Sequence, residues 1–180
     1  MAVHILEEQL ELSNDMLPVQ GTVDIEIPID ELWEVFTHAN WWPIWNQCFF
    51  RVSNKSLVLS RQLTWFFHPI RWWYLYKMPA RAKIVEVEEQ ERVTWQVTVL
   101  PGFYAQHTYH MEDLGNGITR FGSWEKAMGR GFKLMKWFWI PHFVFVRDRS
   151  LQGASFLEAV YQREGRFNEH VLKEGRRSGL

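Results

Sequence analysis

The strongest alternation of hydrophobic and polar residues in this chain runs from residue 93 to residue 99. Every second residue is hydrophobic and the residues between are polar, in the order Val93, Thr94, Trp95, Gln96, Val97, Thr98 and Val99. A period of two is typical of a β-strand with one buried and one solvated face. Residues 21–27 alternate in the same way, and Pro28 ends that segment because proline has no amide hydrogen to donate.

Further strand-like segments follow one another without an intervening helical pattern. They are residues 49–52, 57–68, 80–87, 103–112 and 118–128. Turn-forming residues separate them, as in Pro101-Gly102 and in residues 113–117. Consecutive strands joined by short turns predict an antiparallel meander, which makes about seven strands with the two segments above.

Helical patterns occur on either side of this meander. Asp30 is a candidate N-cap for a short helix over residues 31–37, and a second short helix or turn is expected at residues 41–47. A long helix is expected over residues 141–164, with Pro141 in its first turn. Hydrophobic residues recur there at helical spacing, namely Val144, Leu151, Ala154, Leu157 and Tyr161. The small residues 153–155 indicate either a close backbone approach or an empty space.

The composition of the chain excludes some functional classes and shows one unusual feature, its aromatic content. The chain has 180 residues and a net charge of −1, which gives no electrostatic footprint for nucleic acid. Its single cysteine, Cys48, excludes an intramolecular disulfide and favours a reducing compartment, so we expect a cytoplasmic protein. No signal-peptide pattern and no apolar run of membrane-spanning length is present. The anomaly is the aromatic content of 16%, with 11 Trp, 13 Phe and 5 Tyr, which predicts either an aromatic core or an internal cavity lined by rings.

Three segments resemble one known fold family. They are residues 23–36 (VDIEIPIDELWEVF), 41–46 (WWPIWN) and 117–129 (GITRFGSWEKAMG). In this order they resemble the START-like (SRPBCC) superfamily, which includes birch-pollen-allergen-type proteins and the polyketide cyclase/dehydrase group. The resemblance implies an α+β helix-grip fold, in which a curved antiparallel sheet grips a long C-terminal helix and two short helices follow the first strand. A ketosteroid-isomerase-like cone and a lipocalin-like barrel fit the order of elements less well.

The resemblance also implies the domain limits. The helix-grip domain covers residues 21–164, after an N-terminal extension at 1–20 and before a polar, frayed tail at 165–180. Two aromatic segments depart from the family pattern, at residues 70–79 and 132–140. Each is interpreted as a lid, a dimer contact or ordinary core, and a peripheral membrane patch is a further alternative because Trp is combined with Lys. The sequence leaves the oligomeric state open.

Strand alternation places candidate site residues on the inner face of the sheet. His107 and Tyr109 point inward with Phe103, and the family's closing strand implies the same for Ser123 and Glu125. We consider His107, Glu125 and Tyr109 as acid–base candidates. Ligand contacts are expected from a larger set, namely Trp45, Trp65, Trp95, Phe121, Ser123, Leu151 and Ser155. The site would lie between residues 151–155 and the sheet.

Other chemistry is not supported by the sequence. His107 and His110 are three residues apart on a strand and therefore face opposite sides, so no metal site is expected. No phosphate-binding or dinucleotide motif is present, and no cofactor is expected. His142 is expected to be exposed at the helix start. The family resemblance leaves three alternatives: binding of a hydrophobic, ring-containing or lipid-like molecule, a cyclase/aromatase/dehydratase-type enzyme using His107 or Glu125, or an adaptor without a small ligand.

Overall fold

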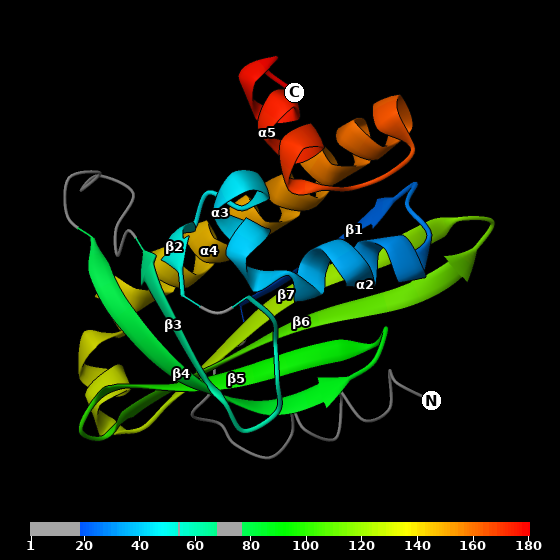
Figure 1. The fold of residues 1–180 in the computed structure, drawn as a ribbon. Coiled ribbons are helices and arrows are strands. Elements are labelled where there is room, and N and C mark those ends of the chain that lie inside the picture. The colour runs from blue at the N-terminus through cyan, green and yellow to red at the C-terminus, as the bar shows by residue number, and fades with distance from the viewer. Residues whose placement is uncertain (1–18, 54, 68–76) are drawn as a thin grey trace.

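A seven-stranded antiparallel sheet wraps around one long helix in the computed structural model of the chain (Figure 1). The structure describes residues 19–53, 55–67 and 77–180. The strands are β1 (Val19–Ile25), β2 (Phe49–Val52), β3 (Gln62–Phe67), β4 (Met78–Glu88), β5 (Arg92–Leu100), β6 (Phe103–Gly115) and β7 (Ile118–Met128). Their order in the sheet is β1-β7-β6-β5-β4-β3-β2. The predicted meander is therefore confirmed, and β1 pairs with the last strand.

Short helices follow β1 as predicted. They are α2 (Ile29–Thr37), the 3-10 turn η1 (Ala39–Trp41) and α3 (Trp42–Trp45). The expected N-cap at Asp30 is wrong, because α2 already begins at Ile29 and no side chain caps it. Asp30 and Glu31 instead lie in the first turn, where negative charge interacts favourably with the helix dipole. Together with the sheet and the long helix α4 (Arg130–Glu164), these elements make the α+β helix-grip fold.

Helix α4 is longer than the sequence predicted. It begins at Arg130, not at Pro141, and its 35 residues run across a kink at Met135. Pro141 lies inside it, and Met135 has non-helical backbone angles (φ −117°, ψ 15°). Burial of aromatic side chains explains why the helix extends before the proline. Phe132 and Trp139 both pack against Phe103, with ring centroids 5.5 and 5.3 Å apart.

A tight turn holds the start of α4 against the sheet. Gly129 has φ +101°, and a Cβ atom there would lie 2.1 Å from the carbonyl oxygen of Gly102. The amide of Gly131 donates a hydrogen bond to the same oxygen at 3.0 Å. Only glycine allows this backbone conformation and approach. The turn after β7 is thereby tied to the β5–β6 turn.

The buried side of α4 follows a helical repeat along most of its length. It consists of Phe132, Trp139, His142, Phe143, Val146, Ser150, Gly153, Ala154, Phe156, Leu157 and Val160. At Gly153 the helix touches Trp45, because an added Cβ would lie 2.8 Å from both the Trp45 ring and its carbonyl oxygen. The small residues at 153–155 therefore serve a close approach and not an empty space.

The C-terminal residues form a packed helix, so the prediction of a frayed tail is wrong. Helix α5 (Glu169–Arg177) is capped by Asn168, whose side chain accepts a hydrogen bond from the Val171 amide at 2.9 Å. Val171 and Leu172 are buried, and Arg176 donates to the carbonyl of Ile44 at 2.8 Å. The amphipathic pattern within a polar composition was the signal for this helix.

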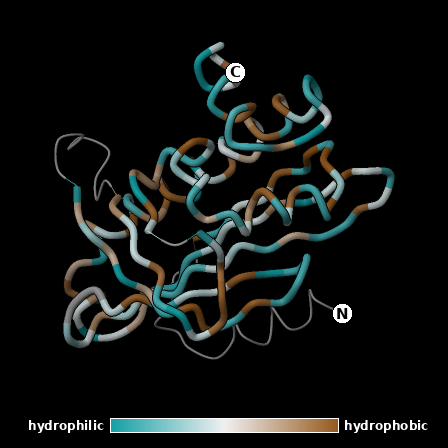
Figure 2. The backbone as a smooth tube through the Cα atoms, in the orientation of Figure 1, coloured by the Kyte–Doolittle hydropathy of each residue, from teal (hydrophilic) through white to brown (hydrophobic). Residues whose placement is uncertain are grey.

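Buried hydrophobic residues form two clusters. The larger lies between the sheet, the short helices and the C-terminal half of α4, whereas the smaller joins the start of α4 to β6 and β7 around Phe103, Trp139 and Phe143. Figure 2 shows hydrophobic and hydrophilic positions alternating along the strands. The predicted N-terminal extension, up to residue 18, and the aromatic segment at residues 70–76 lie outside the described residues. No helix in the described part of the chain is both long and apolar enough to cross a membrane.

The contact between Gly153 and Trp45 leads to a stability prediction. Gly153→Val should lower the free energy of unfolding by about 2 kcal/mol, because the added carbons overlap the indole. Ser155→Val places the same side chain at an exposed position of the same helix, and should change the free energy by only about 0.5 kcal/mol. Urea denaturation followed by circular dichroism measures both variants. Equal stability of the two would contradict the close contact.

Candidate functional site

A cavity of about 430 Å³ lies between the inner face of the sheet and the N-terminal half of α4. Its position differs from the expected one, since the region beneath residues 151–155 is filled by packed side chains. It lies at the junction of the two hydrophobic clusters. Trp65, Trp95 and Val146 come from the larger cluster, and Trp139 and Phe143 come from the smaller one.

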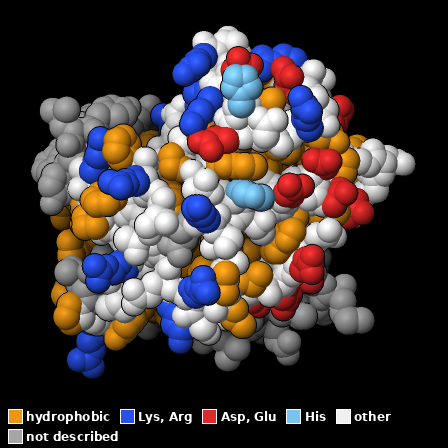
Figure 3. Space-filling view, viewed as in Figure 1, with side chains coloured by type: hydrophobic (Ala, Val, Ile, Leu, Met, Phe, Trp, Pro, Cys, Tyr) orange, Lys and Arg blue, Asp and Glu red, His pale blue; other side chains and the backbone are white. Residues whose placement is uncertain are grey.

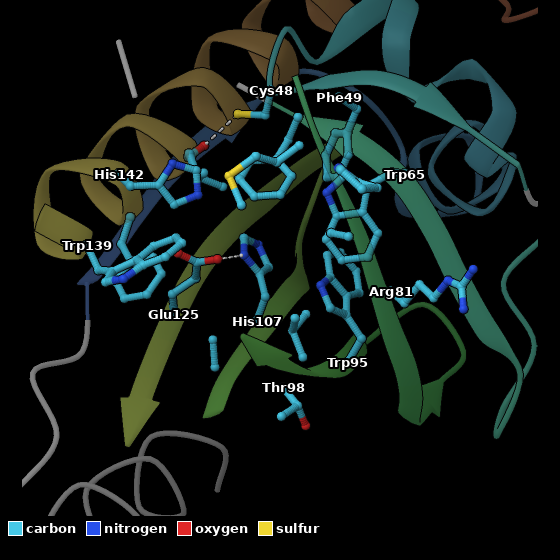
Figure 4. Close-up of a pocket in the computed structure, with 18 residues that line it drawn as sticks. Cys48, Phe49, Trp65, Arg81, Trp95, Thr98, His107, Glu125, Trp139 and His142 are labelled. Atoms are coloured by element: carbon cyan, nitrogen blue, oxygen red, sulfur yellow. Dashed lines mark hydrogen bonds and ion pairs between the residues drawn. The ribbon is translucent and has the colours of Figure 1, made fainter. Parts of the chain in front are cut away.

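Three groups of residues make the walls (Figure 4). The sheet contributes Trp65, Ala80, Trp95, Val97, Ala105, His107 and Glu125, and α4 contributes Trp139, His142, Phe143 and Val146. Cys48 and Phe49 close one side, and the remaining lining residues are Phe67, Met78, Pro79, Arg81 and Thr98. Pro79, Arg81 and Thr98 are exposed and mark the end nearest the surface. The Arg81 side chain points away from the cavity in Figure 4, so its charge does not enter it.

A histidine–carboxylate pair is the polar feature of this apolar space. His107 on β6 lies directly opposite Glu125 on β7, and the His107 Nδ1 to Glu125 Oε1 distance is 2.7 Å. Strand alternation turns both side chains to the inner face, as predicted. The side chains are 5% and 12% exposed, so the pair is largely removed from water. A hydrogen bond between partly desolvated groups is stronger than the same bond at the surface.

Neighbouring side chains fix the orientation of His107. Its ring stacks on the indole of Trp95, with centroids 4.9 Å apart and an angle of 4° between the planes. Its second nitrogen, Nε2, lies 3.4 Å from the Ser123 hydroxyl. Both ring nitrogens are therefore engaged by protein atoms. His107 orients Glu125 and leaves little capacity of its own for a ligand.

Two buried polar atoms in the cavity wall are without a hydrogen-bond partner among the described residues. They are Oε2 of Glu125 and Nε1 of Trp139. A buried polar atom without a partner is unfavourable by about 1–3 kcal/mol. The Glu125 oxygen is an acceptor in the carboxylate form, and the Trp139 nitrogen is a donor. Glu125, and not His107, thus retains a polar atom without a hydrogen-bond partner in the cavity wall.

Cys48 lies in the wall but is not an activated nucleophile. Its thiol donates to the carbonyl of Val146 at 3.4 Å, and its amide donates to the side chain of Asn46 at 3.1 Å. Burial raises the pKa of the Cys48 thiol well above its ordinary value, with a smaller contribution from the charge of Glu125. The residue therefore remains a neutral thiol, in agreement with its predicted place in the core.

Tyr109 belongs to a separate buried network. Its hydroxyl is 2.6 Å from Ser150 Oγ on α4, and Asn46 donates to both hydroxyls at 3.2 and 3.1 Å. Ser150 donates in turn to the carbonyl of Val146 at 2.9 Å. Burial raises the pKa of the Tyr109 phenol well above its ordinary value. This network joins α4 to β6 and to the segment after α3, and Tyr109 does not line the cavity.

The predicted ligand contacts divide into two groups. Trp65 and Trp95 line the cavity, together with His107 and Glu125. The others do not line it: Trp45 and Phe121 are buried in the larger cluster, Ser123 lies behind His107, Leu151 packs near Gly21, and Ser155 is exposed. The expectation that residues 151–155 face the site is therefore corrected, because the helix touches Trp45 at Gly153.

The helix wall of the cavity was missed from the sequence. His142 was expected to be exposed, but it is buried, and its ring centroid lies 5.2 Å from that of Phe67 and 5.6 Å from that of Trp139. Trp139, His142, Phe143 and Val146 recur at spacings of three and four, which is the pattern of one helix face. This pattern continues across Pro141. It was not recognised because Pro141 was assumed to begin the helix.

Metal chemistry has no support in the part of the chain that the structure describes. No group of three or more His, Cys, Asp or Glu side chains converges there. His110 faces the side of the sheet opposite to His107, as predicted, and its ring lies 5.4 Å from that of Trp124. The His107–Glu125 pair is thus not part of a larger group of metal-ligating side chains among the described residues.

Comparison with solved structures identifies the fold. A hypothetical protein from Helicobacter pylori superposes with a TM-score of 0.63 at 13% identity, over 82% of this chain and 90% of that one. Major latex-like protein 151 from Panax ginseng gives 0.61 at 16%, over 80% and 96%. Norcoclaurine synthase from Thalictrum flavum, in complex with dopamine and hydroxybenzaldehyde, gives 0.57 at 15%, over 79% and 87%. No family profile and no curated protein sequence matches the chain. These likenesses show the helix-grip fold.

The buried thiol leads to a pH prediction. Because the folded-state pKa of Cys48 is raised, its protonated form is favoured by folding. The stability that it contributes is complete below the unfolded-state pKa of about 8.5 and is lost as pH rises above it. Between about pH 8.5 and 10 the wild type should lose roughly 1–2 kcal/mol more than Cys48→Ala in urea denaturation. Parallel pH profiles for the two proteins would contradict the burial of a neutral thiol.

Proposed function

We propose that this protein binds a hydrophobic, ring-containing small molecule in the cavity, with a polar group of that molecule held by Glu125. The observation that carries the proposal is the free Oε2 atom of Glu125 in an otherwise largely apolar, aromatic space of about 430 Å³. Pockets for small molecules are mostly apolar and contain a few placed polar groups. The volume is within the range of about 300–1,000 Å³ that such pockets have.

The chemistry of the wall defines the class of ligand. Trp65, Trp95, Trp139 and Phe143 present flat rings, which favour a planar or ring-containing molecule. An ionised Glu125 accepts hydrogen bonds, so the matching group is a hydroxyl or an N–H. Burial of roughly 250 Å² of apolar ligand surface would contribute about 6 kcal/mol before association entropy is subtracted. Because micromolar binding requires about 8 kcal/mol net, the expected affinity is no tighter than about millimolar.

The similar folds support this proposal in general terms. The solved norcoclaurine synthase complex holds dopamine and hydroxybenzaldehyde, which are ring compounds with hydroxyl groups. At 15% identity this likeness carries no residue of that enzyme over to the present chain. What it supports is that a helix-grip fold accommodates molecules of this kind. The class of ligand that this chain binds is inferred from the residues of its own cavity wall.

A substitution that fills the cavity tests binding. With 2-naphthol as the probe, Ala105→Leu should weaken binding at least about tenfold, because the larger side chain enters the space on the inner face of β6. Gln106→Leu adds the same side chain on the opposite face of the same strand and should leave the affinity unchanged. Isothermal titration calorimetry measures both variants, and thermal melting confirms that both are folded. Equal binding by the two variants, or no binding by the wild type, would contradict the proposal.

A second candidate function is catalysis by the His107–Glu125 pair. The specific observation that favours it is that His107 engages one carboxylate oxygen of Glu125, a residue of the cavity wall, and leaves the other without a hydrogen-bond partner among the described residues. In such an enzyme the free oxygen would take a proton from a carbon beside a carbonyl group and return it to the product. His107 would hold the carboxylate in place and balance its charge. Norcoclaurine synthase shows that an enzyme has this fold.

Hydrogen exchange separates catalysis from binding. In deuterated water the wild type should accelerate the exchange of the hydrogens beside the carbonyl of 2-tetralone, measured by mass spectrometry. Glu125→Gln keeps the shape of the side chain and should reduce that rate by a factor of about 10²–10⁴. It should change 2-naphthol affinity far less than Ala105→Leu does. An exchange rate equal in both proteins would leave binding as the function and exclude Glu125 as the base.

A further inference from the structure

The outer side of the first part of α4 exposes large hydrophobic side chains. Leu134 is 79% exposed and Trp137 is 74% exposed, which are the highest values among the large hydrophobic residues in the described part of the chain. The next is Leu59 at 54%. The two residues lie on either side of the kink at Met135, and exposed hydrophobic side chains of this size mark interaction sites. This face lies about four to five turns before Gly153, where the helix packs closely on Trp45.

Positive charge surrounds these two residues. Arg130, Lys133 and Lys136 are exposed on the same segment. Residues 129–147 contain no Asp or Glu, although acidic and basic residues are nearly equal in number over the whole chain, at 21 and 20. Figure 3 shows basic side chains among hydrophobic ones toward the left, where α4 begins, and acidic side chains gathered on the right. The segment is therefore locally cationic in a protein whose net charge is −1.

We propose that this basic aromatic face, formed by Arg130, Lys133, Leu134, Lys136 and Trp137, docks on the surface of an anionic lipid bilayer. Tryptophan and leucine fit the boundary between headgroups and acyl chains, and lysine and arginine extend to the phosphate groups. Each cation near an anionic membrane contributes about 1 kcal/mol. Hydrophobic contact and charge attraction thus act together at one face.

Charge favours a bilayer over a second copy of the chain. In a symmetric dimer the same face meets itself, so the cations of both copies would come together, and residues 129–147 supply no Asp or Glu. Like charges brought together at an interface are unfavourable. An anionic bilayer supplies the opposite charge in excess, and it also accepts the indole and the leucine. Docking does not depend on the cavity being occupied.

The position of this face also relates it to the cavity. Trp139, two residues after Trp137, lines the cavity from the opposite side of the same helical segment. Docking would therefore place the helix wall of the cavity at the membrane surface. The segment also contains the irregular backbone of Met135 and is followed by Pro141, which has no amide hydrogen to donate within the helix.

Vesicle binding tests the proposal with two matched pairs of variants. Wild-type protein should co-sediment with phosphatidylcholine vesicles that contain about one-third phosphatidylserine, and far less with pure phosphatidylcholine. Leu134→Ser with Trp137→Ser should reduce binding at least about tenfold. The control is Leu59→Ser with Leu114→Ser, which removes exposed hydrophobic side chains elsewhere and should bind as the wild type does. Arg130→Glu with Lys136→Glu should reduce binding about 30-fold, and Arg61→Glu with Lys83→Glu much less.

Several results would overturn this inference. They are the absence of binding to anionic vesicles, equal binding to both kinds of vesicle, and unchanged binding of the Leu134 and Trp137 variant. A dimer in sedimentation equilibrium that this variant dissociates would assign the face to a second copy of the chain instead. The substituted residues are exposed, so melting temperatures should remain near that of the wild type. If the variant with Leu134→Ser and Trp137→Ser fails to fold, the variant with Arg130→Glu and Lys136→Glu tests the proposal instead.

Discussion

The contact of Gly153 with Trp45 is the constraint on which the arrangement of sheet and helix depends. It brings the centre of α4 against the segment after β1, and the hydrogen bonds among Asn46, Tyr109 and Ser150 hold it there. The start of α4 is held separately, by aromatic packing of Phe132 and Trp139 on Phe103. Between these two places α4 crosses the curved sheet, and its side chains do not fill all the space between the helix and the sheet. The cavity is the consequence, and its walls come from both hydrophobic clusters.

Strand patterns allowed much of this structure to be predicted. Alternation placed His107 and Tyr109 on the inner face because a strand leaves no other choice once one face is buried, and the resemblance to the family's closing strand placed Glu125 there. It did not distinguish a side chain that lines the cavity from one that packs beside it. Tyr109 and Ser123 share the inner face with Glu125. The Tyr109 hydroxyl forms a hydrogen bond with Ser150 on α4, whereas the Ser123 hydroxyl lies next to the His107 ring. That distinction depends on where the helix crosses the sheet.

The helical parts were harder to predict for a physical reason. Pro141 removes one hydrogen bond and is a fair sign of a helix start, but burial of Phe132, Trp139 and Phe143 outweighs that loss. In the tail, a charged composition obscured the two adjacent residues, Val171 and Leu172, that pack against the body. In both cases tertiary burial decided the structure, and local sequence preference did not.

A ligand bound between the two hydrophobic clusters, as proposed above, would also link the abundance of the protein to the concentration of that ligand. A molecule that binds the folded chain and not the unfolded one raises the free energy of unfolding by about 2.7 kcal/mol at one hundred times its dissociation constant. A difference of that size alters how often a chain opens and meets proteases. Since Val146 and Trp139 belong to different clusters, a ligand between them joins two parts of the core that otherwise meet across a gap. The lifetime of the chain in a cell would then follow the concentration of its ligand.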